Sequence, residues 1–286
     1  NLNEAEQSLT FLKRIVGHIF VIMVKYLINK IPVFYSEDWS KYGNLKGKLM
    51  ELKKLTERIY YTESDSKSDR PVLGYILGDK CSVMIDAGNS ENHVKDYNYA
   101  LEKNGFKRPK YCIITHWHWD HTFGMHALDA ETIAHYKTNE ELHRLSSWMW
   151  SDGAMKQRLI DGEEIAFADE HIRVEYSPLE DIKVITADRT FKDKIVIDCG
   201  KITCQCLHLS SAHSDDSVVI FIPEEKVIFI GDLYNDDFYN NHYRDTEKTK
   251  QLYDALTQID FQIAVVGHSN PIGKKEIINF LGKFIH

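Results

Sequence analysis

From residue 58 onward the chain alternates short apolar runs with turn residues. The runs are four to six residues long, and several form close pairs across turns such as Gly78-Asp79-Lys80 and Pro223-Glu224-Glu225. Pairs of this kind predict β-hairpins, and the remaining apolar runs predict single buried strands. The predicted strands cover residues 58–61, 72–77, 81–85, 111–114, 195–199, 202–207, 218–222, 227–230 and 263–266.

Segments with apolar residues three or four positions apart predict helices between these strands. Thr138 and Glu141 have the spacing of a capping box, which predicts a helix that starts at Thr138 and is stopped by Gly153. Thr246 is the expected cap of a later helix. The predicted helices cover residues 94–103, 138–150, 246–259 and 274–284, whereas residues 154–190 show no clear pattern. Hairpins followed by strand–helix units indicate an α/β chain with mixed sheets.

Residues 1–50 read as a separate N-terminal helical extension, ahead of a main domain over residues 51–286. A helix is expected up to about Asn29, followed by Pro32 and a linker that contains Gly and Lys. The apolar run 15–24 is too short to span a bilayer, which needs about 20 apolar residues. No small-residue cleavage site follows, so a signal peptide is not expected. We expect this helix to pack on the main domain or to form a homodimer, with association at a membrane surface as the alternative.

Charge and cysteine content limit the partners and the compartment. The 35 Lys and Arg against 43 Asp and Glu give a net charge of −8, which disfavours sequence-independent binding of nucleic acid. The five cysteines are odd in number and form no Cys-x-x-Cys pair. Because three of them stand in strand-like runs, we expect buried free thiols and a reducing, cytoplasmic location.

Four side chains that bind metal ions follow the apolar run 111–114 directly. His116, His118, Asp120 and His121 fall within six residues. In an extended segment His116 and His118 point the same way, and a turn after them can bring Asp120 and His121 to the same space. Imidazole nitrogens and a carboxylate are ligands that zinc accepts. The stretch therefore predicts a metal site at the end of a buried strand.

Three downstream residues extend this pattern: His213, Asp232 and His268. With them the chain resembles the metallo-β-lactamase superfamily of hydrolases, whose members carry His-x-His-x-Asp-His, then a lone His, an Asp at a strand end and a final His. The resemblance covers residues 51–286. It implies a metallo-β-lactamase fold, which is a four-layer αβ/βα sandwich of two mixed sheets flanked by helices.

The resemblance also implies a dinuclear zinc site. His116, His118 and His213 would hold one zinc ion, Asp120, His121 and His268 would hold the second, and Asp232 would bridge the two. Three protein ligands for each metal leave a position for a bridging hydroxide, which would attack a polarised carbonyl or phosphoryl centre. Asp120 is the expected catalytic residue, because it could orient this nucleophile or shuttle its proton.

Several neighbouring residues have other expected roles. His208 is an alternative to His213, although it abuts a predicted strand and fits the spacing less well. Asp86 is expected to orient a ligand or fix a turn and not to bind metal. Tyr234 is a candidate hydrogen-bond donor to an oxyanion. Trp117 and Trp119 would wall the cleft or pack beneath it.

Four more aromatic residues are candidates for a substrate pocket, although such residues on helices more often serve a core or an interface. They are Trp148, Trp150, Phe238 and Tyr239.

The leading hypothesis is a zinc-dependent hydrolase of a small carbonyl substrate, namely an ester, thioester, lactone or β-lactam. The bridging Asp232 disfavours a dedicated β-lactamase, because those enzymes generally lack it. A phosphodiesterase acting on a small phosphodiester and an iron-dependent sulfur dioxygenase stay open. A non-catalytic binding protein with a structural metal is the alternative from another class, but structural zinc is usually closed by four protein ligands.

Overall fold

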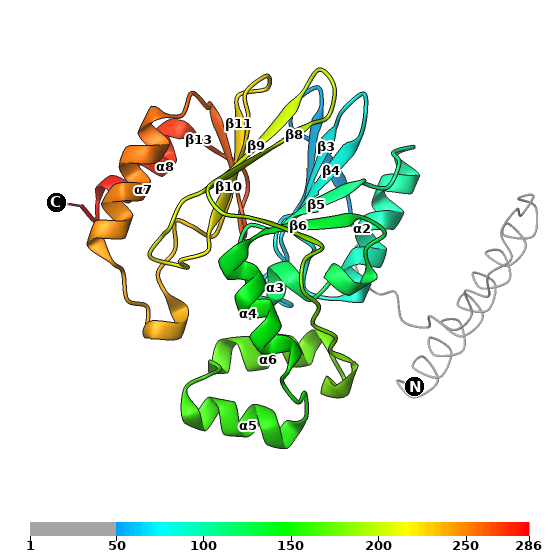
Figure 1. Cartoon of the computed structure of the whole chain (residues 1–286), viewed down its shortest axis with the longest axis vertical. Helices are drawn as coiled ribbons and strands as arrows, with labels where there is room; N and C mark the ends of the chain where they lie inside the picture. Colours follow the sequence, from blue (N-terminus) through cyan, green and yellow to red (C-terminus); the bar gives the residue numbers. More distant parts are fainter. Residues whose placement is uncertain (1–49, 286) are drawn as a thin grey trace, which may run out of the picture. The chain divides into compact units, whose positions relative to one another are not determined.

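The computed structural model describes residues 50–285, in which two β-sheets lie face to face between helices (Figure 1). The first sheet has seven strands in sequence order, antiparallel from β1 to β4 and parallel from β4 to β7. Its strands are β1 Leu52–Lys54, β2 Ile59–Thr62, β3 Gly74–Leu77, β4 Ser82–Ile85, β5 Tyr111–Ile113, β6 Glu131–His135 and β7 Arg189–Phe191.

The second sheet has six strands in the order β13-β12-β11-β10-β9-β8. It is antiparallel except between β11 and β12, which run parallel. Its strands are β8 Lys194–Asp198, β9 Thr203–His208, β10 Val218–Ile222, β11 Val227–Gly231, β12 Ile263–Val266 and β13 Ile272–Gly273.

Helices cover the outer face of each sheet. Helices α2 Glu91–Lys103 and α4 Tyr136–Ser146 pack on the first sheet, and α7 Thr246–Gln258 and α8 Lys274–Gly282 pack on the second. The predicted four-layer αβ/βα sandwich is therefore confirmed. Helices α5 Asp152–Asp161 and α6 Ala166–Glu175 form a helical insert between β6 and β7, next to the short helix α3 Trp119–Thr122 (Figure 1).

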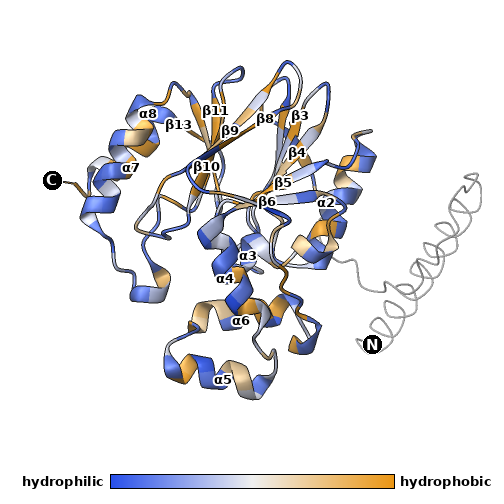
Figure 2. Cartoon of the chain, in the orientation of Figure 1, coloured by the Kyte–Doolittle hydropathy of each residue, from blue (hydrophilic) through white to orange (hydrophobic). Residues whose placement is uncertain are grey.

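The main core lies between the two sheets, where the strands are apolar on both faces. In β4, Val83 and Ile85 point into this core, whereas Met84 packs towards the helices. Strand β11 follows the same rule, with Phe229 facing the other sheet and Ile228 facing the helices. Figure 2 shows the resulting run of hydrophobic strands in both sheets. Burial on both faces explains why these strands read as continuous apolar runs in the sequence.

The structure corrects two predicted helix starts. Helix α4 begins at Tyr136, not at Thr138, and it ends at Ser146. The hydroxyl of Thr138 does not cap the helix but donates to the buried carboxylate of Asp216, at 2.7 Å. Helix α7 is capped by the side chain of Asp245, which accepts from the backbone N–H of Lys248, and not by Thr246.

Other elements were not predicted at all. Strands β1, β6, β7 and β13 are only two to five residues long, and β7 pairs on one side only, at the edge of its sheet. The insert helices α5 and α6 occupy part of residues 154–190, where no clear pattern was found. Gly153, the predicted stop signal, lies inside α5.

Two further predictions concern the cysteines and the N-terminal extension. All five cysteines are free thiols, four of them buried, as expected. The predicted helix up to Asn29 and the homodimer contact lie outside the described residues, and the boundary at residue 50 stays a prediction. Within residues 50–285, no helix is both long and apolar enough to cross a membrane.

Phe229 tests the contribution of the core between the sheets. It is 3 % exposed, and its ring lies so close to Gly74 of the first sheet that a Cβ there would be 2.5 Å from it. We expect Phe229→Ala to lower the free energy of unfolding by about 3–5 kcal/mol, because it removes an aromatic ring and leaves a cavity. Val196→Ala, at a half-exposed position in the same sheet, should change it by less than about 0.5 kcal/mol. Urea denaturation measures both, and equal losses would contradict this view of the core.

Candidate metal centre

All seven predicted ligands come together at one edge of the sandwich, just beyond the ends of strands. His116 follows β5, His213 lies in the loop after β9, and Asp232 directly follows β11. His268 follows β12, and α3 carries Asp120 and His121. Six of the seven side chains are buried and His268 is half-buried.

Within the described residues, these side chains form three overlapping groups in which one ligand atom of each member lies within 4.8 Å of the others. The first group is His116, His118 and His213, and another is Asp120, His121 and His268. These match the two ligand sets that the sequence predicts. The third group joins Asp232 to His116 and His121, so that Asp232 contacts both sets, as a bridging ligand must.

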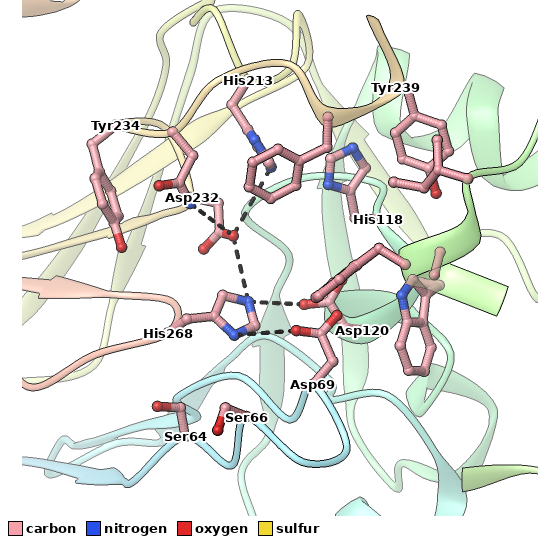
Figure 3. Close-up of a pocket in the computed structure, with 16 residues that line it drawn as sticks. Ser64, Ser66, Asp69, His118, Asp120, His213, Asp232, Tyr234, Tyr239 and His268 are labelled. Carbon is pink, nitrogen blue, oxygen red and sulfur yellow. Dashed lines mark hydrogen bonds and ion pairs between the residues drawn. The ribbon is translucent and has the colours of Figure 1, made fainter. Parts of the chain in front are cut away.

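Nitrogen and oxygen atoms approach one another closely inside this cluster. Nε2 of His213 lies 3.3 Å from Nε2 of His116. Nε2 of His268 lies 3.0 Å from Oδ2 of Asp120 and 3.4 Å from Oδ2 of Asp232 (Figure 3). The lone pairs of both sets therefore point into a shared space.

Two buried polar atoms test whether this donor set fits a metal. Oδ1 of Asp232 finds no hydrogen-bond partner among residues 50–285, and Nε2 of His121, 3.8 Å from it, makes no hydrogen bond although Oδ2 of Asp120 lies 3.0 Å away. Buried polar atoms normally have a partner, because leaving them without one costs about 1–3 kcal/mol. A cation between them would satisfy both atoms, and imidazole with carboxylate is a donor set that suits zinc. The residues present fit the metal that the sequence predicts.

Asp86 holds one ligand of each set in position. It accepts hydrogen bonds from the backbone N–H and the hydroxyl of Thr115, at 2.7 and 2.9 Å, and from Nδ1 of His121, at 2.8 Å. The Thr115 oxygen is then free to accept from Nδ1 of His116, at 3.1 Å. Both rings thereby carry a proton on Nδ1 and aim Nε2 at the cluster. Asp86 orients ligands, as the sequence suggested.

Similar constraints act on the ligands from the second sheet. Nδ1 of His213 donates to the backbone carbonyl of Asp236, at 2.8 Å, which again leaves Nε2 for a metal. A Cβ at Gly267 would lie 1.9 Å from Oδ1 of Asp232. Glycine is therefore required there for the Asp232 carboxylate to reach its place. His208, the alternative to His213, instead stacks on His135 with ring centroids 3.9 Å apart.

Burial and neighbouring charges shift the pKa values of the two sets in opposite directions. Burial lowers the pKa of His116 and His118 well below the usual range, so both rings are neutral at pH 7. Burial would also lower the pKa of His268, but Asp232 and Asp120 raise it to about 9. The pKa of His121 shifts in the same direction as that of His268. Burial lowers it, but Asp120 and Asp86 outweigh that effect and raise it well above the usual range. The second set thus attracts positive charge more strongly than the first.

Five of the seven side chains of the cluster line the floor of a cavity of about 320 Å³: His118, Asp120, His213, Asp232 and His268. Sequence reasoning missed several residues of its wall, which are Ser64, Ser66, Asp69, Ile165, Phe167 and Ala168. Asp69 lies 3.6 Å from Nδ1 of His268, and burial beside Asp120 raises its pKa to about 7. It stands in the polar stretch Glu63-Ser64-Asp65-Ser66-Lys67-Ser68-Asp69, which resembles an ordinary solvated turn. No signal in the sequence separates it from its neighbours.

The aromatic candidates separate into pocket and core residues. Tyr234, Phe238 and Tyr239 line the cavity. Trp148 and Trp150 pack with the helical insert and do not line it, so the more common core role holds for them. Trp119 does both: it is 4 % exposed, packs in that core and borders the cavity. Trp117 packs against the ring of Tyr239, 5.2 Å away.

Two mixed sheets between helices, with a His- and Asp-rich cluster at one edge, define a class of metallohydrolase fold. The sequence model of one protein family, the Metallo-beta-lactamase superfamily, matches residues 69–268 of the chain. The chain belongs to this superfamily, and the resemblance read from its motifs is confirmed.

Relatives and solved structures agree with this membership. The chain is 20% identical over 245 residues to "Acyl-coenzyme A thioesterase MBLAC2" of Bos taurus and 19% identical to the Homo sapiens protein of that name. Each alignment covers 81% of this chain and 82% of the relative. Among solved structures, DIM-1 metallo-beta-lactamase superposes with a TM-score of 0.59 at 18% identity, over 83% of this chain and 97% of its own. A metallo-beta-lactamase from Pontibacter korlensis gives 0.58 at 16% identity, over 82% and 98%. At these identities the structures show the shared fold.

Asp86→Asn tests whether the Asp86 network prepares the metal site. The backbone of Asp86 has a φ of 59°, a conformation that asparagine tolerates. Only one terminal atom of the amide can accept, so either the backbone N–H of Thr115 loses its acceptor, or the Thr115 hydroxyl and Nδ1 of His121 lose theirs. We expect a 10- to 100-fold loss of zinc affinity, measured by competition with a chromophoric chelator.

Asp188→Asn is the matched control for this variant. Asp188 accepts from the backbone N–H and the hydroxyl of Thr132, the same local arrangement away from the ligand cluster. It should lose stability without losing zinc affinity. Equal zinc affinity in both variants would remove the orienting role of Asp86.

Proposed function

We propose that this protein is a zinc-dependent hydrolase that cleaves acyl thioesters. The observation that carries the proposal is the set of three overlapping ligand groups at the floor of a cavity large enough for part of a substrate. The thioester is favoured among small carbonyl substrates because both relatives named above are called acyl-coenzyme A thioesterases and align over 82% of their length.

In this proposal the predicted ligands form two sets, one for each of two zinc ions. His116, His118 and His213 would hold one zinc ion, and Asp120, His121 and His268 would hold the other, with Asp232 between them. Zinc held there would polarise a carbonyl oxygen and lower the pKa of a bound water molecule towards neutrality.

Asp120 and Tyr234 would act directly on the reacting groups, Asp120 as a proton acceptor and Tyr234 as a hydrogen-bond donor. Nε2 of both His121 and His268 lies 3.0 Å from Oδ2 of Asp120, which leaves Oδ1 to orient the attacking water and accept its proton. Burial raises the pKa of Tyr234 to about 12, so its hydroxyl stays protonated at neutral pH. It borders the cavity and can donate a hydrogen bond to the oxygen that becomes negative in the transition state. The proton that Asp120 accepts would then pass to the sulfur as the C–S bond breaks, so that the water adds to the thioester and the products are a carboxylic acid and a thiol.

The other expectations from sequence belong to this proposal. A small-molecule substrate and no nucleic-acid partner agree with the cavity and the net charge of −8. Five free thiols favour a reducing, cytoplasmic location. The competing function is a non-catalytic binding protein with a structural metal, and phosphodiester hydrolysis is the other enzymatic one.

Metal removal separates these functions. Elemental analysis should give about two zinc ions per chain. Dialysis against a chelator should abolish hydrolysis of an acyl thioester while circular dichroism stays unchanged, and two equivalents of zinc should restore the rate. A parallel panel of lactone, β-lactam and phosphodiester substrates should give lower kcat/KM values. If chelation unfolds the protein and no substrate of the panel is hydrolysed, the binding function is correct.

Asp120→Ala tests the catalytic assignment. The variant loses both a metal ligand and the acceptor for the proton of the attacking water, so kcat should fall at least about a hundredfold. Asp260→Ala removes a surface carboxylate, 81 % exposed, that pairs with Lys226. This control should hydrolyse the thioester at the rate of the unaltered protein. Unchanged kcat in Asp120→Ala would reject the role of Asp120.

A further inference from the structure

The cavity above the ligand cluster has two walls of opposite character. One wall is apolar, and its members come from the helical insert and from the 3₁₀ turn 238–240: Ile165, Phe167, Ala168, Phe238 and the ring of Tyr239. The other wall carries hydroxyl and carboxyl groups: Ser64, Ser66 and Asp69 (Figure 3). In Figure 3, Ser64 and Ser66 lie on one side of the cluster and Tyr239 lies on the other.

A buried hydrogen bond locks the two segments of the apolar wall together. The hydroxyl of Tyr239 donates to Oε1 of Glu164, at 3.0 Å. Glu164 is 5 % exposed and also accepts from the backbone N–H of Ile165, so the carboxylate fixes both segments at once. These two hydrogen bonds offset the free-energy cost of burying the Glu164 carboxylate. The wall is therefore built into the fold although its halves are about seventy residues apart in sequence.

The same wall reaches the ligand cluster. The ring of Tyr239 packs against that of His118, with centroids 5.2 Å apart, and Phe238 packs against His213 at 5.4 Å. Both histidines belong to the first ligand group. A substrate chain that lies on this wall would thus start at the reacting carbonyl and run outward over the insert.

Phe167 extends the wall to the mouth of the cavity. It is the second residue of α6, and its side chain is 48 % exposed, whereas Ala168 and Ile172 of the same helix are buried in the core of the insert. Its ring lies 6.5 Å from that of Phe238. It also packs on the ring of His171 of the same helix, 4.2 Å away, but is not part of the core of the insert. The exposed part of the phenyl group is surface that a ligand in the cavity could cover.

We infer that the apolar wall, with Phe167 at its outer end, binds the acyl chain and selects for its length, while the polar wall faces the thiol part. This rests on the proposed thioester hydrolysis. An acyl chain offers only methylene groups, which gain free energy by leaving water, whereas a thiol carrying amide groups can bond to hydroxyl and carboxyl groups. Each methylene covered by the wall corresponds to about a fourfold gain in kcat/KM.

The test compares straight-chain thioesters of one thiol, from acetyl to decanoyl. For the unaltered holoenzyme, kcat/KM should rise by about fourfold per methylene until the wall is covered. Phe167→Ala and Ile165→Ala should reduce the rise to about twofold, so that their loss grows with chain length. Val174→Ala is the matched control, because Val174 is 59 % exposed on the same helix and does not line the cavity. It should follow the unaltered enzyme.

A second series places the alkyl chain on the thiol side of an acetyl thioester. The rise per methylene in this series should be small and should not respond to Phe167→Ala. If Phe167→Ala changes only the thiol series, the walls are assigned the wrong way round. If it changes neither series while the unaltered enzyme hydrolyses thioesters, the wall does not select the chain. If no form of the holoenzyme hydrolyses any thioester, the proposed function itself is wrong.

Discussion

Burying imidazole and carboxylate groups together is the constraint on which the organisation of this protein depends. Desolvation of such groups costs several kcal/mol for each charge unless hydrogen bonds or an opposite charge compensate it. Here Asp86 and Thr115 satisfy the outer nitrogens of His116 and His121. The inner atoms of the cluster face one another, and bound cations would satisfy them. The apolar sandwich supplies the rigid frame that keeps these groups close together.

The position of the cluster follows from the strands. A side chain placed one to three residues after a buried strand is held by the hydrogen bonds of the whole sheet, and β5, β11 and β12 are each followed by a predicted ligand in this way. The two sheets face each other through a close-packed core, so ligands from both arrive at the same edge. A change of packing beneath the site would therefore move ligand atoms relative to one another.

The sequence predicted the parts of the site that depend on local geometry. The stretch from His116 to His121 needs only a strand end and a turn, and Asp232 and His268 each follow an apolar strand next to a glycine. Two features depended instead on contacts between distant segments. Asp69 belongs to the site only because His268, about two hundred residues away, packs against it. Thr138 has the spacing of a helix cap, yet its hydroxyl binds Asp216 from another part of the fold.

The helical insert was missed for a related physical reason. Only Met155 and Arg158 of α5 and only Ala168 and Ile172 of α6 are buried, so neither helix has a continuous apolar stripe. The guanidinium of Arg158 lies over the rings of Trp148 and Trp150, at 4.4 and 4.7 Å, and takes the place of an apolar residue in this small core. A segment stabilised by such contacts shows weak periodicity in its sequence.

The ligand cluster and the apolar wall of the cavity are built from different parts of the fold. The ligands come from strand ends that the sheets fix, whereas the apolar wall comes from the insert and the turn 238–240, which are tied to each other by Glu164 and Tyr239. The turn 238–240 touches the ligand cluster through ring contacts such as that of Tyr239 with His118, and the insert shares no strand with either sheet. Its shape can therefore set which substrate fits while the ligand geometry stays constant. In this fold, one ligand cluster can serve different substrates when the loops and helices around it change.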